Sequence, residues 1–197
     1  IKTINPTERS AKDGITSVSK ANQQHIPTPA LLLTSMSESD TVRIGQAIGH
    51  SIRIGDVVFL SGDLGAGKTR MVHGLADAIQ SPVSARSPTF VIVNEYPGRV
   101  HINHCDLYRL GSPEEVEDLA LEERLANGAL VVEWPEIGIP VLPDDFLYLR
   151  FENGSDENER HITFTPNGPR SANLLSRSAA VYESLDGAVG LHKSQTI

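Results

Sequence analysis

Eight consecutive residues in the first half of the chain have the spacing of a phosphate-binding loop. Residues 62–69 read Gly-Asp-Leu-Gly-Ala-Gly-Lys-Thr, which satisfies the pattern G-x-x-x-x-G-K-[ST]. The glycines of such a loop let the backbone curl, so that several N–H groups point at one anion. We expect Lys68 to reach the β- and γ-phosphates of a nucleotide and the Thr69 hydroxyl to ligate Mg²⁺.

The sequence around this loop has the order that the motif requires. Residues 57–60 form a short apolar run typical of a buried strand, and a helical spacing of apolar residues follows Lys68 as far as residue 79. Strand, loop and helix therefore succeed one another as in phosphate-loop proteins. The residues expected to contact the nucleotide are Asp63, Leu64, Gly65, Ala66, Gly67, Lys68, Thr69 and Arg70.

Two carboxylates follow predicted strands and are candidates for a metal site. Glu133 ends the apolar run 130–132, and Asp106 ends the segment 100–105. Both could face Mg²⁺ at neighbouring strand ends, and either could polarise an attacking water. The alternatives are an ordinary exposed acid for Glu133 and a turn cap for Asp106, since aspartate often caps turns.

Three further polar residues have weaker assignments. Ser87 and Thr89 flank a proline after the loop helix, where phosphate-loop proteins often sense the γ-phosphate. The alternative for both is a simple Ser-Pro turn. His104 is better explained as a packing or orienting residue than as a catalyst, and without Cys or His partners at ligand spacing it predicts no zinc site.

The remaining pattern predicts an α/β domain with flanking segments. We assign residues 1–29 to a disordered or artificially added arm, 30–166 to one phosphate-loop ATPase domain, and 167–197 to a tail or linker that is helical over 174–185. Ser37 and Ser112 are the expected N-caps of two helical regions, the second of them (116–125) split in two. The expected strands are 30–33, 57–60, 90–96, 100–105, 129–132, 146–151 and 160–164, with 90–96 and 100–105 paired as a hairpin.

Composition excludes several classes of function. The 197 residues carry a net charge of −8, which argues against salt-driven binding of the chain as a whole to DNA or RNA. No run approaches the roughly 18 apolar residues of a membrane span. Cys105 is the single cysteine, so no internal disulfide forms and a reducing compartment, the cytoplasm, is expected. No Asn-Lys-x-Asp signature for guanine follows the loop, which favours ATP over GTP.

Five sequence blocks in series resemble one family. After the loop come Ser87-Pro88-Thr89-Phe90, Asn94-Glu95-Tyr96, His104-Cys105-Asp106-Leu107-Tyr108-Arg109 and Glu133-Trp134-Pro135-Glu136. In this order they resemble the TsaE (formerly YjeE) ATPases of bacterial tRNA threonylcarbamoyladenosine (t6A) synthesis, over about residues 35–165.

The resemblance implies a single-domain α/β phosphate-loop fold with a central, mostly parallel sheet flanked by helices. It implies weak Mg²⁺-dependent ATP hydrolysis that partner subunits, TsaD and TsaB, activate, with tRNA engaged only indirectly. By the same analogy Thr69, Asp106 and Glu133 surround the metal, Trp134 lies near the nucleotide, and Lys68 joins both acids in catalysis.

One position departs from the family pattern. Arg70 stands where the family usually has a Thr or Ser that helps to hold the α-phosphate.

Two other functions fit a phosphate loop as well. One is a small-molecule kinase, for which the chain shows no arginine-rich lid, although Arg109 and Arg124 leave room for one. The other is a module that senses ATP without hydrolysing it. The two candidate acids, Asp106 and Glu133, argue against this alternative.

Overall fold

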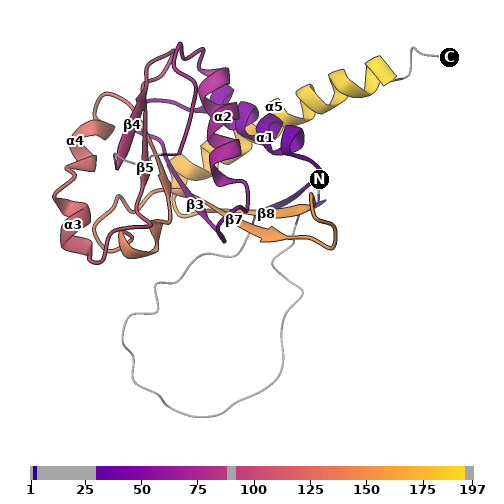
Figure 1. Ribbon diagram of the computed structural model, residues 1–197. Helices are drawn as coiled ribbons and strands as arrows, with labels where there is room; N and C mark the ends of the chain where they lie inside the picture. Colours follow the sequence, from indigo (N-terminus) through magenta and orange to yellow (C-terminus); the bar gives the residue numbers. More distant parts are fainter. Residues whose placement is uncertain (1, 4–29, 88–91, 194–197) are drawn as a thin grey trace.

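The chain folds around one mixed β-sheet. The structure, a computed structural model, describes residues 2–3, 30–87 and 92–193, with side chains as far as residue 186 (Figure 1). In the sheet order β1-β2-β8-β7-β3-β6-β5-β4, the four strands β7, β3, β6 and β5 are parallel, and antiparallel pairs extend the sheet at both edges. The strands are β1 Lys2–Thr3, β2 Leu31–Ser35, β3 Val57–Ser61, β4 Val93–Tyr96, β5 Ile102–Asp106, β6 Ala129–Glu133, β7 Leu147–Asn153 and β8 Arg160–Pro166.

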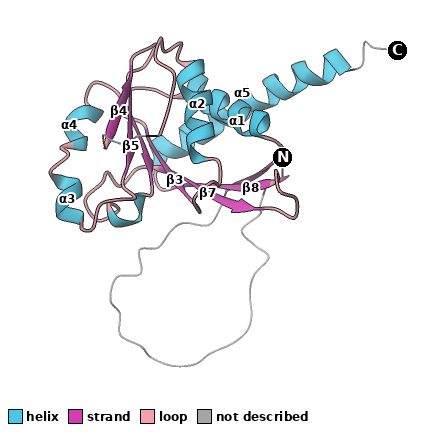
Figure 2. Ribbon diagram, in the orientation of Figure 1, coloured by secondary structure: helices cyan, strands magenta, loops and turns pink. Residues whose placement is uncertain are grey.

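Helices cover both faces of the sheet (Figure 2). One face carries α1, α2 and α5, and the other carries the short helices α3 and α4 together with the 3₁₀ turn η1. The helices are α1 Glu38–Ser51, α2 Lys68–Ala78, α3 Pro113–Glu117, α4 Leu121–Leu125, η1 Pro135–Ile137 and α5 Pro169–Lys193. The expected α/β fold with a central sheet and a phosphate loop is confirmed, and its parallel part is the middle of the sheet.

The apolar runs of the central strands are explained by burial on both faces. Along β3, Val58 and Leu60 belong to the core beneath α1 and α2, whereas Val57 and Phe59 belong to the core beneath α3 and α4. All four are buried. Because successive strand residues point to opposite faces, a strand covered on both sides needs apolar residues at every position.

Helices α1 and α2 pack closely because small residues line their contact. A Cβ on Gly45 would overlap the backbone carbonyl of Met71, and one on Gly74 would overlap that of Val42. Glycine at these positions lets the two backbones touch. The contact fixes α1 beside the helix that follows the phosphate loop.

The helix caps and the hairpin follow the predicted pattern. The Ser37 side chain accepts from the Asp40 N–H at the start of α1, and the Ser112 side chain accepts from the Glu115 N–H at the start of α3. Strands β4 and β5 form the expected antiparallel hairpin. Helix α5 begins earlier and ends later than the expected 174–185. Of the arm 1–29 that was predicted to be disordered, Lys2–Thr3 form strand β1 against β2, and residues 1 and 4–29 lie outside the described residues. Among the helices that the structure describes, none is long and apolar enough to cross a membrane.

Candidate functional site

The phosphate loop joins the C-terminal end of β3 to the first turn of α2. Gly62, Gly65 and Gly67 adopt φ of 137°, 80° and 103°, a region of backbone conformation that favours glycine. Gly67 is also the N-cap of α2, where no side chain caps the helix. The first N–H groups of α2 therefore stay available to an anion, whose charge the helix dipole favours.

Lys68 is buried and held within its own loop. Its Nζ donates to the carbonyl oxygens of Gly62 at 2.6 Å and Asp63 at 2.8 Å, and it lies 3.9 Å from the centre of the Trp134 ring. Burial lowers the pKa of Lys68, and the carboxylates of Glu133 and Asp106 oppose this shift. The lysine is thus a pre-placed cation at the mouth of the loop.

Thr69 and Glu133 are in direct contact. The Thr69 hydroxyl donates to Oε1 of Glu133 at 2.9 Å. Glu133 ends β6, which lies beside β3, so the parallel register brings the carboxylate to the loop. With only 3% of its surface exposed, Glu133 is a buried acid, and the alternative of an ordinary exposed residue is wrong.

Asp106 stands opposite Glu133 in the register of β5 and β6 and lines the same cleft. Its Oδ1 accepts from the Tyr108 N–H at 3.0 Å, so this oxygen caps a turn. Burial raises the pKa of Asp106, and the negative charge of Glu133 raises it further, whereas the Tyr108 N–H, His104 and Lys68 act in the opposite sense. Asp106 is half-buried, and because a carboxylate has two oxygens, one can cap the turn while the other remains for a ligand.

A chain of hydrogen bonds leads from Glu133 into the sheet. His104 is fully buried, and its Nε2 lies 3.0 Å from Glu133 Oε1. Its Nδ1 lies 3.4 Å from the Tyr96 hydroxyl, which donates to the carbonyl of Arg86 at 3.1 Å. His104 is therefore an orienting residue for Glu133, and the structure adds Tyr96, to which the sequence patterns assigned no role.

Trp134 closes the cleft beside the loop lysine. Its backbone has a φ of 56°, an uncommon conformation for a bulky residue and one associated with functional sites. The indole packs on Tyr108 with ring centres 4.9 Å apart. Tyr108 is 62% exposed, so the two rings form an aromatic edge that a planar ligand could meet.

The cleft has a volume of about 350 Å³, and its far wall was not expected from the sequence. That wall comes from the start of α1 and from the turn between β7 and β8, and its residues are Ser37, Glu38, Thr41, Asn158 and Arg160. Ser37 was expected only as a helix cap, and no motif marks the other four. The packing of α1 on α2 places Glu38 and Thr41 in the cleft, and the pairing of β7 with β3 places Asn158 and Arg160 there; no local pattern encodes either arrangement.

The other predicted residues have varied positions. Gly65, Ala66, Gly67 and Leu64 line the cleft, and Leu64 is 83% exposed. Asp63 meets Lys68 through its backbone. Arg70 also lines the cleft, and its guanidinium pairs with Glu38 at 3.1 Å. Ser87 lines the cleft too, whereas Thr89 lies outside the described residues.

The donor set suits a hard cation that binds mainly through phosphate and water. In the described ranges, no group of three or more His, Cys, Asp or Glu side chains could hold a metal by itself. Thr69, Glu133 and Asp106 supply one hydroxyl and two carboxylates. Mg²⁺ usually takes one or two carboxylates and completes its shell with substrate phosphates and waters, so these residues fit Mg²⁺.

Comparison with known proteins identifies the family. The family model described as "Threonylcarbamoyl adenosine biosynthesis protein TsaE" matches residues 35–162. The chain belongs to the TsaE family. The Streptomyces coelicolor protein named tRNA threonylcarbamoyladenosine biosynthesis protein TsaE is 40% identical over 136 residues, a match covering 66% of this chain and 92% of that protein.

Other TsaE-family relatives agree with this placement. The Bacillus subtilis protein named tRNA threonylcarbamoyladenosine biosynthesis protein TsaE is 36% identical over 138 residues, which is 69% of this chain and 85% of that protein. The crystal structure of Bacillus subtilis YdiB superposes with a TM-score of 0.64 at 30% identity, covering 76% of this chain and 94% of YdiB. The whole of helix α5 lies beyond the residues that match the TsaE model.

Proposed function

We propose that this TsaE-family chain is a Mg²⁺-dependent ATPase that supports the t6A modification of tRNA. The observation that carries the proposal is the hydrogen bond from Thr69 to Glu133, which places a buried acid beside the hydroxyl that phosphate-loop proteins offer to the metal. Family membership supports the t6A pathway, since the relatives are named for it.

Each residue of the site has one task in this proposal. The loop N–H groups and the N-terminus of α2 hold the phosphates, and Lys68 exchanges its bonds to Gly62 and Asp63 for phosphate oxygens. Thr69 and the two acids hold Mg²⁺, which neutralises charge on the phosphates when bound. His104 fixes the orientation of Glu133, so that the second carboxylate oxygen faces the metal or an attacking water.

The nucleotide base has two candidate neighbours in this site. Trp134 offers an aromatic face, and the wall of Ser37, Thr41, Asn158 and Arg160 offers hydrogen-bonding groups. Arg70 is engaged by Glu38, so it approaches the phosphates only if that exposed ion pair opens. We propose that Ser87 and Thr89 sense the γ-phosphate.

Hydrolysis by the chain alone is expected to be slow and to increase with partner subunits TsaD and TsaB, which would engage the tRNA in the cytoplasm. The test is phosphate release from ATP by the chain alone, by the chain with the TsaB–TsaD pair, and by Lys68→Ala with the same pair. Stimulation that Lys68→Ala abolishes supports the proposal. Transfer of phosphate to a metabolite would favour a kinase, and tight ATP binding without release, even with partners, would favour a sensor.

A further inference from the structure

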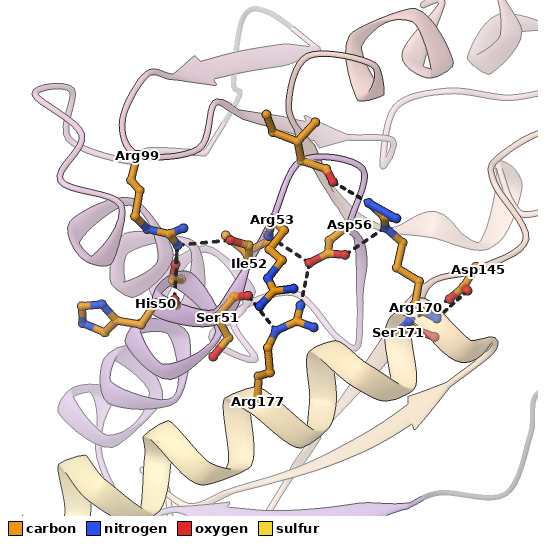
Figure 3. Close-up of polar contacts among 12 residues, drawn as sticks. His50, Ser51, Ile52, Arg53, Asp56, Arg99, Asp145, Arg170, Ser171 and Arg177 are labelled. Atoms are coloured by element: carbon orange, nitrogen blue, oxygen red, sulfur yellow. Dashed lines mark hydrogen bonds and ion pairs between the residues drawn. The ribbon is translucent and has the colours of Figure 1, made fainter.

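Four arginines gather at the end of the sheet opposite the phosphate loop. We call Arg53, Arg99, Arg170 and Arg177 the arginine surface (Figure 3). They come from the turn before β3, from the turn between β4 and β5, and from α5. The phosphate loop follows the last residue of β3, and the arginine surface surrounds Asp56, the residue before its first. The length of β3, roughly 15 Å, therefore separates the arginine surface from the phosphate loop.

One buried carboxylate organises this surface. Asp56 is 2% exposed, and it accepts from the Arg53 N–H at 2.9 Å, from Nε of Arg170 at 3.1 Å and from Nη2 of Arg177 at 3.2 Å. Gly55, whose φ of 85° favours glycine, lies directly beside the Arg170 guanidinium, so a side chain there would displace this group. Asp56 therefore anchors the first turns of α5 to the start of β3.

Backbone carbonyls hold the guanidinium groups without neutralising them. Arg99 Nη2 donates to the carbonyls of Gly49 at 2.7 Å and Ile52 at 3.1 Å, and Arg177 Nε donates to that of Ser51 at 3.2 Å. Carbonyls at the C-terminal end of α1 carry only partial negative charge. A second acid, Asp145, is occupied by the first N–H groups of α5. In the part of the chain that the structure describes, the ion pairs of these arginines are those of Arg170 and Arg177 with Asp56, and Asp145 acts on Arg170 through its charge.

Several donors of this surface remain available. Among the described residues, the Nη1 groups of Arg99, Arg170 and Arg177 and the entire guanidinium of Arg53 make no hydrogen bond. A guanidinium offers five N–H donors in a fixed fork, so one edge can be held while the other faces a ligand. The side chain of Arg170 is 50% exposed and that of Arg177 27%.

The clustered charges also repel one another. The pKa of Arg177 is lowered, chiefly by burial, and the positive charges of Arg53 and Arg170 lower it further, against the attraction of Asp56. An anion between these side chains would relieve that repulsion. The surface therefore offers charge, oriented donors and an energetic reason to take up anions.

We propose that the arginine surface binds the phosphate backbone of an RNA. Arginine forks match phosphate oxygens bidentately, and a surface built by several segments suits a ligand that repeats its charge. The net charge of −8 does not forbid this, because at physiological salt charges more than about 8 Å apart are largely screened. The anion preference stands on the geometry, whereas the choice of RNA among polyanions rests on the proposed function, to which it adds a direct contact of this chain with the tRNA that the partner subunits engage.

The experiment measures the binding of a fluorescein-labelled tRNA transcript to the full chain by anisotropy at several salt concentrations. Arg53→Glu is the main variant, because its side chain holds no other group in place. We expect it to weaken binding about tenfold and to reduce the log–log salt slope by about one, with Arg53→Ala weakening binding less. Arg150→Glu is the matched control, because this substitution changes the charge by the same amount. Arg150 is 63% exposed, pairs with Glu152 and lies away from the arginine surface.

Three results would overturn the proposal. The first is a wild-type chain that does not bind tRNA, and the second is equal weakening of binding by Arg53→Glu and Arg150→Glu. The third is binding of polyglutamate in place of tRNA, which would indicate an acidic protein partner. ATP binding by the same variants separates this proposal from the proposed function. Lys68→Ala should lose nucleotide binding and keep tRNA binding, and Arg53→Glu should do the reverse.

Discussion

The hydroxyl of Thr69 and the carboxylate of Glu133, 64 residues apart in the chain, share a hydrogen bond of 2.9 Å. Adjacent parallel strands make this contact, because β3 and β6 both end at the phosphate loop. The pair joins the first turn of α2 to the end of β6. Its chemistry depends on the negative charge of Glu133, which leads to the first prediction.

Glu133→Gln should lower Mg²⁺-dependent ATP hydrolysis by on the order of 100-fold. The amide keeps the size of the side chain and can still accept a hydrogen bond from Thr69. The loss of activity therefore measures the contribution of the negative charge alone. Affinity for ATP without Mg²⁺ should be unchanged or higher, since a negative charge beside the phosphates is removed. Phosphate release and nucleotide titration measure both effects. Glu122→Gln on the exposed side of α4 is the control, and unaltered turnover in Glu133→Gln would remove this acid from the mechanism.

His104→Ala should reduce activity roughly 10- to 100-fold, because partners that orient a metal-binding group usually have effects of this size. The half-saturating Mg²⁺ concentration should rise, since Glu133 loses the bond that fixes it. Tyr96→Phe removes only the hydroxyl that contacts His104, and it should have a smaller effect in the same direction. A folded His104→Ala protein with the Mg²⁺ dependence of the wild type would show that the histidine only packs.

The raised pKa of Asp106 predicts a specific pH dependence of stability without metal or nucleotide. Above the unfolded-state pKa of about 3.8, the native state binds more protons at this site than the unfolded state, so ionisation destabilises the fold progressively as pH rises through the native pKa. Asp106→Asn should therefore be more stable than the wild type at pH 7, and the difference should shrink toward pH 4. Urea unfolding at both pH values measures this. A difference that grows on acidification would contradict the direction of the shift.

Gly74→Ala should destabilise the protein by about 1–3 kcal/mol despite the better helix propensity of alanine, because the new Cβ meets the Val42 carbonyl of α1. The free energy of unfolding in urea is the measurement. Gly111→Ala is the control, since its nearest neighbour is a side-chain oxygen of Glu115 at 4.0 Å, and it should be nearly neutral. Equal stability of the two variants would mean that α1 can shift away from α2 without cost.

Cys105 should be unreactive in the native protein. The side chain is fully buried, and burial raises its pKa to about 12, so the thiolate that reacts is scarce at pH 8. Ellman's reagent should label less than a tenth of the thiol before unfolding and all of it in denaturant. Because Cys105 is the single cysteine, the labelling rate reports opening of the β5 region directly. Rapid labelling of the folded chain would show that this strand opens readily.

The sequence by itself determined the features that depend on neighbouring residues. The phosphate loop requires glycines and a lysine at fixed spacing, Ser37 and Ser112 cap helices through local hydrogen bonds, and the run 129–132 requires burial on both faces. Each of these rests on backbone conformation or periodicity within a few residues, so a short segment suffices to predict it.

Only the tertiary structure decided which distant side chains meet. The far wall of the cleft, the link from Tyr96 through His104 to Glu133, and the four arginines around Asp56 join segments that share no local pattern. Strand order and the close contact of α1 with α2 create these encounters, and both depend on packing free energy summed over the whole core. No short window of sequence contains that sum.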